Sequence, residues 1–271
     1  MADKHRVRVR LTAMVVLFAV CFFGSFMLGR YPIEPWTLIR VLASRVIPVT
    51  PDWPSQVETV LFNVRLPRVL MAALIGAGLA AAGAAYQGIF KNPMVSPDVL
   101  GASSGAGFGD ALGLFLSFSY QGVSFLAFVL GLSAVGAVCL ISSRVKYNQT
   151  LGLVLAGMMI SSLFTAAVSF LKLVADPNNT LPVITYWLMG SLASIRPKDL
   201  AFAAPWIIGG ILPIYLLRWK INVLTLGEEE ARCIGVNTSA VRLAVVLCAT
   251  LITSAAVSVS ASMLDMRVCR C

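Results

Sequence analysis

Long apolar segments with few charged residues recur along the chain and constrain its fold more than any other feature. A helix needs roughly 20 apolar residues to cross the hydrocarbon core of a bilayer. Segments of about this length lie at 11–29, 66–90, 99–118, 123–141, 151–174, 200–217 and 241–260. They lack the strict alternation of barrel strands. The sequence therefore predicts an all-α, polytopic transmembrane helix bundle with about seven spans.

The composition supports this fold class. Hydrophobic residues make up 58% of the chain and charged residues only 12%, whereas a soluble domain is usually about 25% charged. A soluble enzyme is therefore excluded. The net charge of +9 raises the alternative of nucleic-acid binding, which needs basic residues clustered on one wet face. Here Lys and Arg lie mostly in short segments between apolar ones, where they set topology, so we expect membrane lipid and no nucleic acid.

The basic start of the chain indicates its orientation. Lys4, Arg6, Arg8 and Arg10 precede the first apolar segment, and no small-x-small cleavage site follows. We interpret segment 11–29 as a retained first helix with a cytoplasmic N-terminus. The apolar stretch 183–192 is too short to cross and predicts a re-entrant or interfacial piece.

The residues that usually build catalytic or metal sites are sparse. The single histidine, His5, lies in the basic N-terminal segment. No zinc-like or redox CxxC pattern occurs among the cysteines, which are Cys21, Cys139, Cys233, Cys248, Cys269 and Cys271. We therefore expect no catalytic residues, no metal and no cofactor.

Small residues repeat at helical spacing in two apolar segments. Gly101, Gly105, Gly109 and Gly113 recur every four residues, which places them along one helix face. Gly76, Ala80 and Ala84 repeat the pattern in segment 66–90. Because little hydrophobic force drives helices together in lipid, small residues favour close backbone approach. The pattern predicts tight helix packing, with a sliding or gating role as the alternative.

Polar groups within the apolar segments are few, namely Gln87, Asp110 and Lys172. An ionisable residue inside a span is by default a functional hypothesis, although Lys172 lies near a segment end and can extend to the interface. A proton-coupled carrier or a membrane enzyme needs a richer set of buried acids and histidines, so both readings are disfavoured.

The most acidic stretch of the chain lies at 224–236. Residues 228–234 lie between two glycines and carry acids in the first turn, which predicts a short helix with a favourable dipole interaction. Leu226, Ala231 and Ile234 are expected to form a small apolar face. Such a helix suits docking to a soluble cytoplasmic partner; the alternative is a solvated loop.

This stretch resembles the coupling segment of FecCD-type permeases, the membrane subunits of ABC importers for iron chelates, haem and vitamin B12. Other segments resemble that family in the same order: Arg65-Leu66-Pro67-Arg68 its RLPR, 83–93 its GxxxQxxxxNP, 97–106 its PDLLG…SGA, and 187–192 its WLMGSL. The resemblance extends from about residue 11 to residue 260.

The resemblance implies a permease dimer, formed with a second copy or a paralogue, with the pathway at the dimer interface. Two cytoplasmic ATP-binding subunits would bind beneath it, and the chain itself has no GxxxxGK[ST] motif. The coupling residues would be Leu226, Gly227, Glu228, Glu229, Glu230, Ala231, Arg232 and Gly235.

Two further sets of residues follow from the resemblance. Arg65 and Arg68 match arginines that meet acidic residues of an extracytoplasmic substrate-binding protein; headgroup contact or topology charge is the alternative. Candidate pathway residues, for which ordinary packing is the alternative, are Met158, Met159, Ser161 and Ser162. The expected cargo is an iron-siderophore chelate, with haem or vitamin B12 as alternatives.

The resemblance ends at residue 260. We therefore expect an incomplete permease domain at 1–260, followed by a polar, cysteine-containing tail without family residues at 261–271. This departure favours a C-terminal truncation, and a transport-defective remnant is an alternative reading of the function.

Overall fold

The computed structural model describes residues 2–29, 31, 33–44, 53–92, 95–144 and 149–260. All regular secondary structure in these ranges is helical, which confirms the all-α prediction. The chain divides into two units, Met1–Ala73 and Leu74–Cys271, and each is described by itself. The tail predicted at 261–271 lies outside the described residues.

The first unit contains α1 (Ala2–Met27), α2 (Pro35–Ala43), α3 (Ser55–Thr59), the π-helical turn η1 (Val60–Arg65) and the start of α4 (Leu66–Phe90). From Ser55 to Phe90 the chain forms one uninterrupted helical stretch. A small core joins the end of α1 to α2, α3 and η1; its buried members are Phe26, Ile33, Leu38, Val41, Val57 and Leu61. Most of α1 is exposed apolar surface, as expected for a helix that faces lipid.

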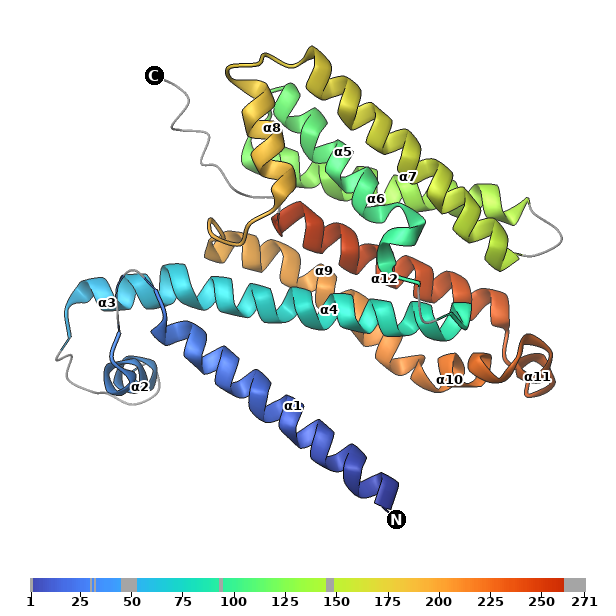
Figure 1. Cartoon of the computed structure of the whole chain (residues 1–271), viewed down its shortest axis with the longest axis horizontal. Helices are drawn as coiled ribbons and strands as arrows, with labels where there is room; N and C mark the ends of the chain where they lie inside the picture. The colour runs from blue at the N-terminus through green and yellow to red at the C-terminus, as the bar shows by residue number, and fades with distance from the viewer. Residues whose placement is uncertain are drawn as a thin grey trace. The chain divides into compact units, whose positions relative to one another are not determined.

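The second unit continues from α4 through the short 3₁₀ turn η2 (Pro97–Leu100) into eight helices (Figure 1). These are α5 (Ala102–Phe115), α6 (Tyr120–Ser143), α7 (Gln149–Val174), α8 (Thr180–Met189), α9 (Pro197–Leu216), α10 (Arg218–Leu226), α11 (Glu228–Cys233) and α12 (Thr238–Ser260).

Successive long helices of this unit run in opposite directions, so its connections collect at two ends (Figure 1). At the end that carries α8, Tyr120 at the start of α6 packs its ring on Trp187. At the same end, the backbone of Ser191 donates a hydrogen bond to the carbonyl of Ser260, the last residue of α12. We call this the α8 end. The opposite end carries α10 and α11, and we call it the α11 end.

Six helices among the described residues are long and apolar enough to cross a membrane: His5–Met27, Ser55–Phe90, Tyr120–Ser143, Leu151–Val174, Pro197–Leu216 and Thr238–Ser260. The remaining predicted span, 99–118, instead forms part of η2 and the 14-residue helix α5. At 1.5 Å per residue, α5 is about 21 Å long, short of the roughly 30 Å of a hydrocarbon core. The stretch 183–192 lies mostly in the short apolar helix α8.

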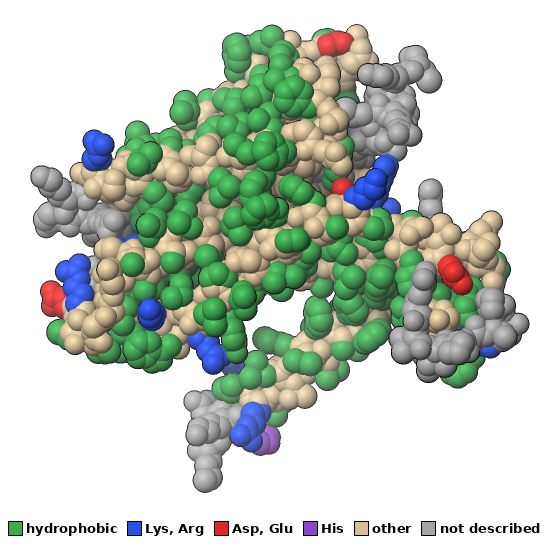
Figure 2. Space-filling view, turned by 180° about the vertical axis from the view of Figure 1, so that it is seen from behind, with side chains coloured by type: hydrophobic (Ala, Val, Ile, Leu, Met, Phe, Trp, Pro, Cys, Tyr) green, Lys and Arg blue, Asp and Glu red, His purple; other side chains and the backbone are tan. Residues whose placement is uncertain are grey.

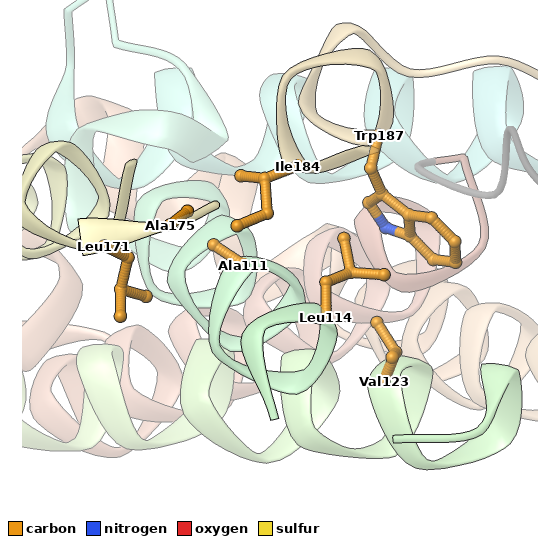
Figure 3. Packing of buried hydrophobic residues seen from close by; sticks show 7 residues of the cluster. All are labelled: Ala111, Leu114, Val123, Leu171, Ala175, Ile184 and Trp187. Carbon is orange, nitrogen blue, oxygen red and sulfur yellow. The ribbon is translucent and has the colours of Figure 1, made fainter. Parts of the chain in front are cut away.

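One buried hydrophobic cluster of the second unit lies where α5, α6, α7 and α8 meet. Figure 3 shows Ile184 and Trp187 of α8 directed at Ala111 and Leu114 of α5. Hydrophobic side chains are spread over the whole face seen in Figure 2, and charged side chains are few. Such a surface is costly in water and favourable in lipid, so the chain has the architecture of a multi-pass membrane protein.

Candidate functional site

Helix α11 is built as a short, defined element. Its first turn is closed by the Ala231 amide, which donates to the Gly227 carbonyl at 3.1 Å. At its other end the Val236 amide donates to the Ala231 carbonyl, and the Gly235 amide donates to the Arg232 carbonyl, each at 2.9 Å. Gly235 has φ +84°, a left-handed conformation that glycine adopts without steric cost. This is the Schellman termination that satisfies the last helix carbonyls, so the segment is not an irregular loop.

The two sides of α11 differ in exposure. Ala231 is fully buried, so the predicted apolar face of Leu226, Ala231 and Ile234 is wrong for Ala231. Leu226 and Ile234 are 68% and 54% exposed. The charged side chains of Glu229, Glu230 and Arg232 are also exposed, whereas the side chain of Glu228 lies outside what the structure describes. The outer surface of α11 therefore combines two exposed apolar side chains with charges of both signs.

A continuous path leads from α11 into the centre of the second unit. Asn237 caps α12, since its side-chain oxygen accepts a hydrogen bond from the Ala240 amide at 3.0 Å. Helix α12 then packs against α5, α6 and α9. Its inward residues Val245, Ala249 and Ile252 are buried. Helix α12 therefore connects the α11 segment to three helices of the bundle.

Exposed side chains follow one side of α7 along its length, and the large apolar ones are Leu151, Leu155, Met158, Met159, Leu163, Phe170, Leu173 and Val174. Among the predicted pathway residues, Met158, Met159 and Ser162 lie on this side, whereas Ser161 is half-buried. We call this surface the α7 face.

The polar groups of the α7 face are satisfied within the helix. Ser162 Oγ donates to the Met158 carbonyl at 2.9 Å, and Ser169 Oγ donates to the Thr165 carbonyl at 3.0 Å. Thr165 Oγ1 likewise donates to the Ser161 carbonyl at 2.8 Å. Because these hydroxyls already donate their protons within the helix, they can only accept further hydrogen bonds, and the face is weakly polar and contains sulfur.

The opposite side of α7 contacts η2 through a glycine that sequence analysis missed. A β-carbon on Gly157 would lie 2.1 Å from the Val99 carbonyl oxygen, a distance that no side chain tolerates. Gly101, which ends η2 with φ +78°, lies beside Ser161. The signal available in the sequence was the pair of small residues Gly157 and Ser161, spaced by four.

The glycine repeat of α5 lies against α6. β-Carbons on Gly105 and Gly109 would lie 2.6 Å from Ala134 Cβ and 2.5 Å from Ala127 Cα. A β-carbon on Gly113 would lie 3.1 Å from Val123 Cα. Gly101, the first of the four, precedes α5 and contacts α7 instead.

The second small-residue repeat, in α4, meets no other helix of the second unit. A β-carbon on Gly76 would meet nothing within 4 Å, and Ala80 and Ala84 are exposed. The predicted packing of these residues is therefore not seen within the second unit. Helix α4 instead uses Gly78, where a β-carbon would lie 2.7 Å from the Ile252 side chain. Small residues therefore lie on two faces of α4, and the positions of the neighbouring helices determine which face makes the close contact.

Of the two arginines predicted to meet a binding protein, Arg65 is buried and Arg68 is half-buried. Arg65 is only 8% exposed, and its guanidinium donates to the backbone carbonyls of Phe26 and Tyr31. It thereby links the end of α1 to η1, the helical turn that leads into α4. Arg68 is half-buried, and its buried Nε has no hydrogen-bond partner within the described residues.

The polar residues predicted within spans lie in different surroundings. Asp110 is fully buried, and within the described residues neither carboxyl oxygen has a hydrogen-bond partner. The Trp187 indole is its polar neighbour but does not reach hydrogen-bond geometry. Lys172 lies half-buried in the last turn of α7, and Gln87 is exposed. No group of His, Cys, Asp and Glu in the described ranges is arranged to hold a metal ion.

Comparison with known proteins gives a consistent result. Residues 17–263 match the FecCD transport family. The chain is 36% identical to the molybdate import system permease protein MolB of Haemophilus influenzae, across 93% of this chain and 73% of that protein. It is 35% identical to a probable iron chelatin transport system permease protein of Helicobacter pylori, across 93% and 75%. It is 31% identical to the hemin transport system permease protein HmuU of Yersinia pestis, across 96% and 76%.

A solved structure agrees in fold. An inward-facing structure described as a metal-chelate type ABC transporter superposes with a TM-score of 0.81 at 32% identity, covering 95% of this chain and 77% of that chain. Together with the six candidate spans, these matches identify a multi-pass protein of the inner membrane. The family predicted from the sequence motifs is confirmed: the chain belongs to the FecCD transport family and is a permease subunit of an ABC importer.

Proposed function

We propose that this chain moves an iron chelate of the siderophore type inward across the inner membrane, driven by ATP hydrolysis in a separate cytoplasmic subunit. The observation that carries the proposal is α11, a defined and charged helix that is exposed at one end of the bundle and joined to the central helix α12. The relative named for iron chelatin and the structure described as metal-chelate type support this cargo. Relatives named for hemin, cobalamin and molybdate provide the alternatives.

In this proposal α11 docks into a groove of the ATP-binding subunit. The exposed apolar side chains of Leu226 and Ile234 supply contact area. Glu229, Glu230 and Arg232 supply charges that orient the two proteins. Gly227 and Gly235 shape the two ends of the helix. Closure of the ATP-binding subunits on nucleotide would then move α11 and α12 together as a rigid body.

The α7 face is proposed as the surface on which a second permease copy, or a paralogue, encloses the pathway. An exposed apolar strip along a whole helix is typical of an interaction surface or of lipid contact. Flexible methionines such as Met158 and Met159 adapt to different shapes. Because the hydroxyl of Ser162 is already hydrogen-bonded, the face can pass a bulky chelate without holding it tightly.

We also propose contact with an extracytoplasmic substrate-binding protein. Arg68 is the better candidate of the two arginines, because Arg65 is already bonded to backbone carbonyls. The basic residues before the first span, including Arg6 and Arg8, support a cytoplasmic N-terminus.

The native cysteine Cys233 provides the test of docking. It is exposed in the last turn of α11. A variant that retains only Cys233 should form a thiol-to-amine cross-link with the co-expressed ATP-binding subunit in membranes. A matched variant that retains only Cys21, exposed in α1, should form none. Equal cross-linking of the two variants would contradict docking at α11.

The cargo is tested separately. Cells that express the chain with its partner subunits should accumulate a labelled ferric siderophore, and they should accumulate less labelled haemin, vitamin B12 and molybdate. Preferential uptake of one of the other three would reject the siderophore while leaving the permease proposal intact. If cells in which the Cys233 cross-link forms take up none of the four compounds, transport by this chain is rejected.

A further inference from the structure

A cavity at the α8 end belongs to none of the transport surfaces described above. It has a volume of about 330 Å³ and is lined by Tyr120, Gln121, Ser124, Phe125, Lys198, Asp199, Phe202 and Val259. These residues come from α6, α9 and α12, not from α7 or α11. The cavity therefore lies away from the α7 face and at the end of the unit opposite α11.

The positions of the lining residues place the cavity at the level where helices leave the membrane. Its residues from α6 and α9 all lie within the first six residues of those helices, and Val259 is the last residue but one of α12. All three helices are candidate membrane spans. The ends of spans lie at the boundary between hydrocarbon and headgroups. An occupant of this cavity must therefore suit a bilayer interface.

One side of the cavity carries a cation. Lys198, in the first turn of α9, is exposed and has no ion pair within the described part of the chain. The neighbouring Asp199 also lines the cavity, and its Oδ2 accepts a hydrogen bond from the Arg196 amide at 2.8 Å. The positive end of the α9 dipole adds to the charge of Lys198. Ser124 Oγ, also in the lining, is buried and has no partner among the described residues.

The other side is apolar and continues toward the middle of the bilayer. Phe125 and Phe202 line the cavity and are exposed. One turn deeper on the same helix sides, Val129 of α6 and Trp206 of α9 are also exposed. Side chains of the two helices meet at this depth, where the centroids of the Phe128 and Trp206 rings lie 5.2 Å apart. An exposed apolar strip therefore runs from the cavity along the α6–α9 contact.

We propose that this cavity binds a glycerophospholipid, with its phosphate at Lys198 and an acyl chain along Phe125 and Phe202. A cation beside an apolar strip at the interface matches an amphiphile, whereas a free phosphate would leave the aromatic side unused. The cavity is at the small end of ligand pockets, roughly 300–1,000 Å³. It fits a headgroup, and the acyl chain continues outside it along the strip.

Native mass spectrometry of the full chain in detergent, titrated with dioleoyl phosphatidylglycerol, tests this site. Lys198→Ala should lower the retained lipid about fivefold, the effect of one lysine at a membrane surface. Lys172→Ala provides the matched control, because Lys172 lies in the last turn of α7 at the same end but does not line the cavity. An excess of inorganic phosphate should not displace the lipid.

A second variant separates the cavity from general surface charge. Gln121 is exposed at the cavity, so Gln121→Trp should fill it and reduce lipid retention while Lys198 remains. The thermal midpoint of each variant verifies folding. The site is rejected if Lys198→Ala retains lipid like the unmodified chain, if Lys172→Ala loses as much, or if Gln121→Trp changes nothing. Displacement by inorganic phosphate would show an anion site and would also reject the lipid.

Discussion

Gly109 of α5 lies so close to Ala127 of α6 that a β-carbon on Gly109 would stand 2.5 Å from Ala127 Cα. Non-bonded carbons prefer about 3.5–4.0 Å, so the two backbones can approach this closely only because position 109 has no side chain. This contact brings α5, which is too short to cross alone, into the centre of the second unit. It also leads to a direct test of helix packing.

Gly109→Ala should destabilise the chain by about 1–3 kcal/mol, because the added methyl group meets backbone atoms that cannot rotate away. Gly136→Ala in α6 is the matched control, since a β-carbon there meets nothing within 4 Å. That change should leave stability equal or slightly higher through helix propensity. Thermal unfolding of both variants in the same detergent gives the comparison. An unchanged midpoint for Gly109→Ala would contradict the close packing.

Gly235→Ala should weaken docking more than it weakens the fold. The left-handed φ of +84° costs an alanine roughly 1–2 kcal/mol, although open space surrounds the position. The backbone strain is relieved without unfolding the rest of the chain if α11 loses its Schellman termination. We therefore expect a lower yield of the Cys233 cross-link with a nearly constant thermal midpoint. Gly235→Asn should retain most of the yield, because asparagine tolerates this conformation.

Arg65→Gln should lower stability, because the guanidinium donates to two backbone carbonyls from a buried position. Hydrogen bonds from a charged group contribute about 1.5–3 kcal/mol each to stability. Arg68→Gln should lower the thermal midpoint less. If Arg65 instead served mainly to meet a binding protein, its substitution would reduce binding-protein affinity and leave the midpoint unchanged. Measuring both quantities on each variant distinguishes the two roles.

Asp110→Asn should raise the thermal midpoint. The carboxyl is fully buried with no hydrogen-bond partner in the described structure, and a neutral amide of the same shape is less costly to bury than a carboxylate. Because the amide also lacks partners, the expected gain is smaller than the roughly 1–3 kcal/mol that one unsatisfied buried group costs. A lower midpoint for Asp110→Asn would mean that the carboxyl has a stabilising partner, such as an internal water beside Trp187.

The sequence by itself determined the class of fold and the family. Apolar length predicted the membrane helices because the hydrocarbon core allows few alternatives to a helix of about 20 residues. The acidic stretch between Gly227 and Gly235 predicted α11 because capping and dipole effects are local to the chain. Both predictions depended on interactions within a single segment.

Only the tertiary structure decided which faces meet. The repeats at Gly105 and at Gly76 look alike in sequence, but within the second unit only the first lies against another helix. Ala231 is buried, and Arg65 donates a hydrogen bond to the backbone of α1, which is distant from it in sequence. Periodicity states which residues share a face, whereas contact depends on the shape and position of neighbouring helices. In lipid, where hydrophobicity does not distinguish inside from outside, that choice is made by close packing and by hydrogen bonds between helices.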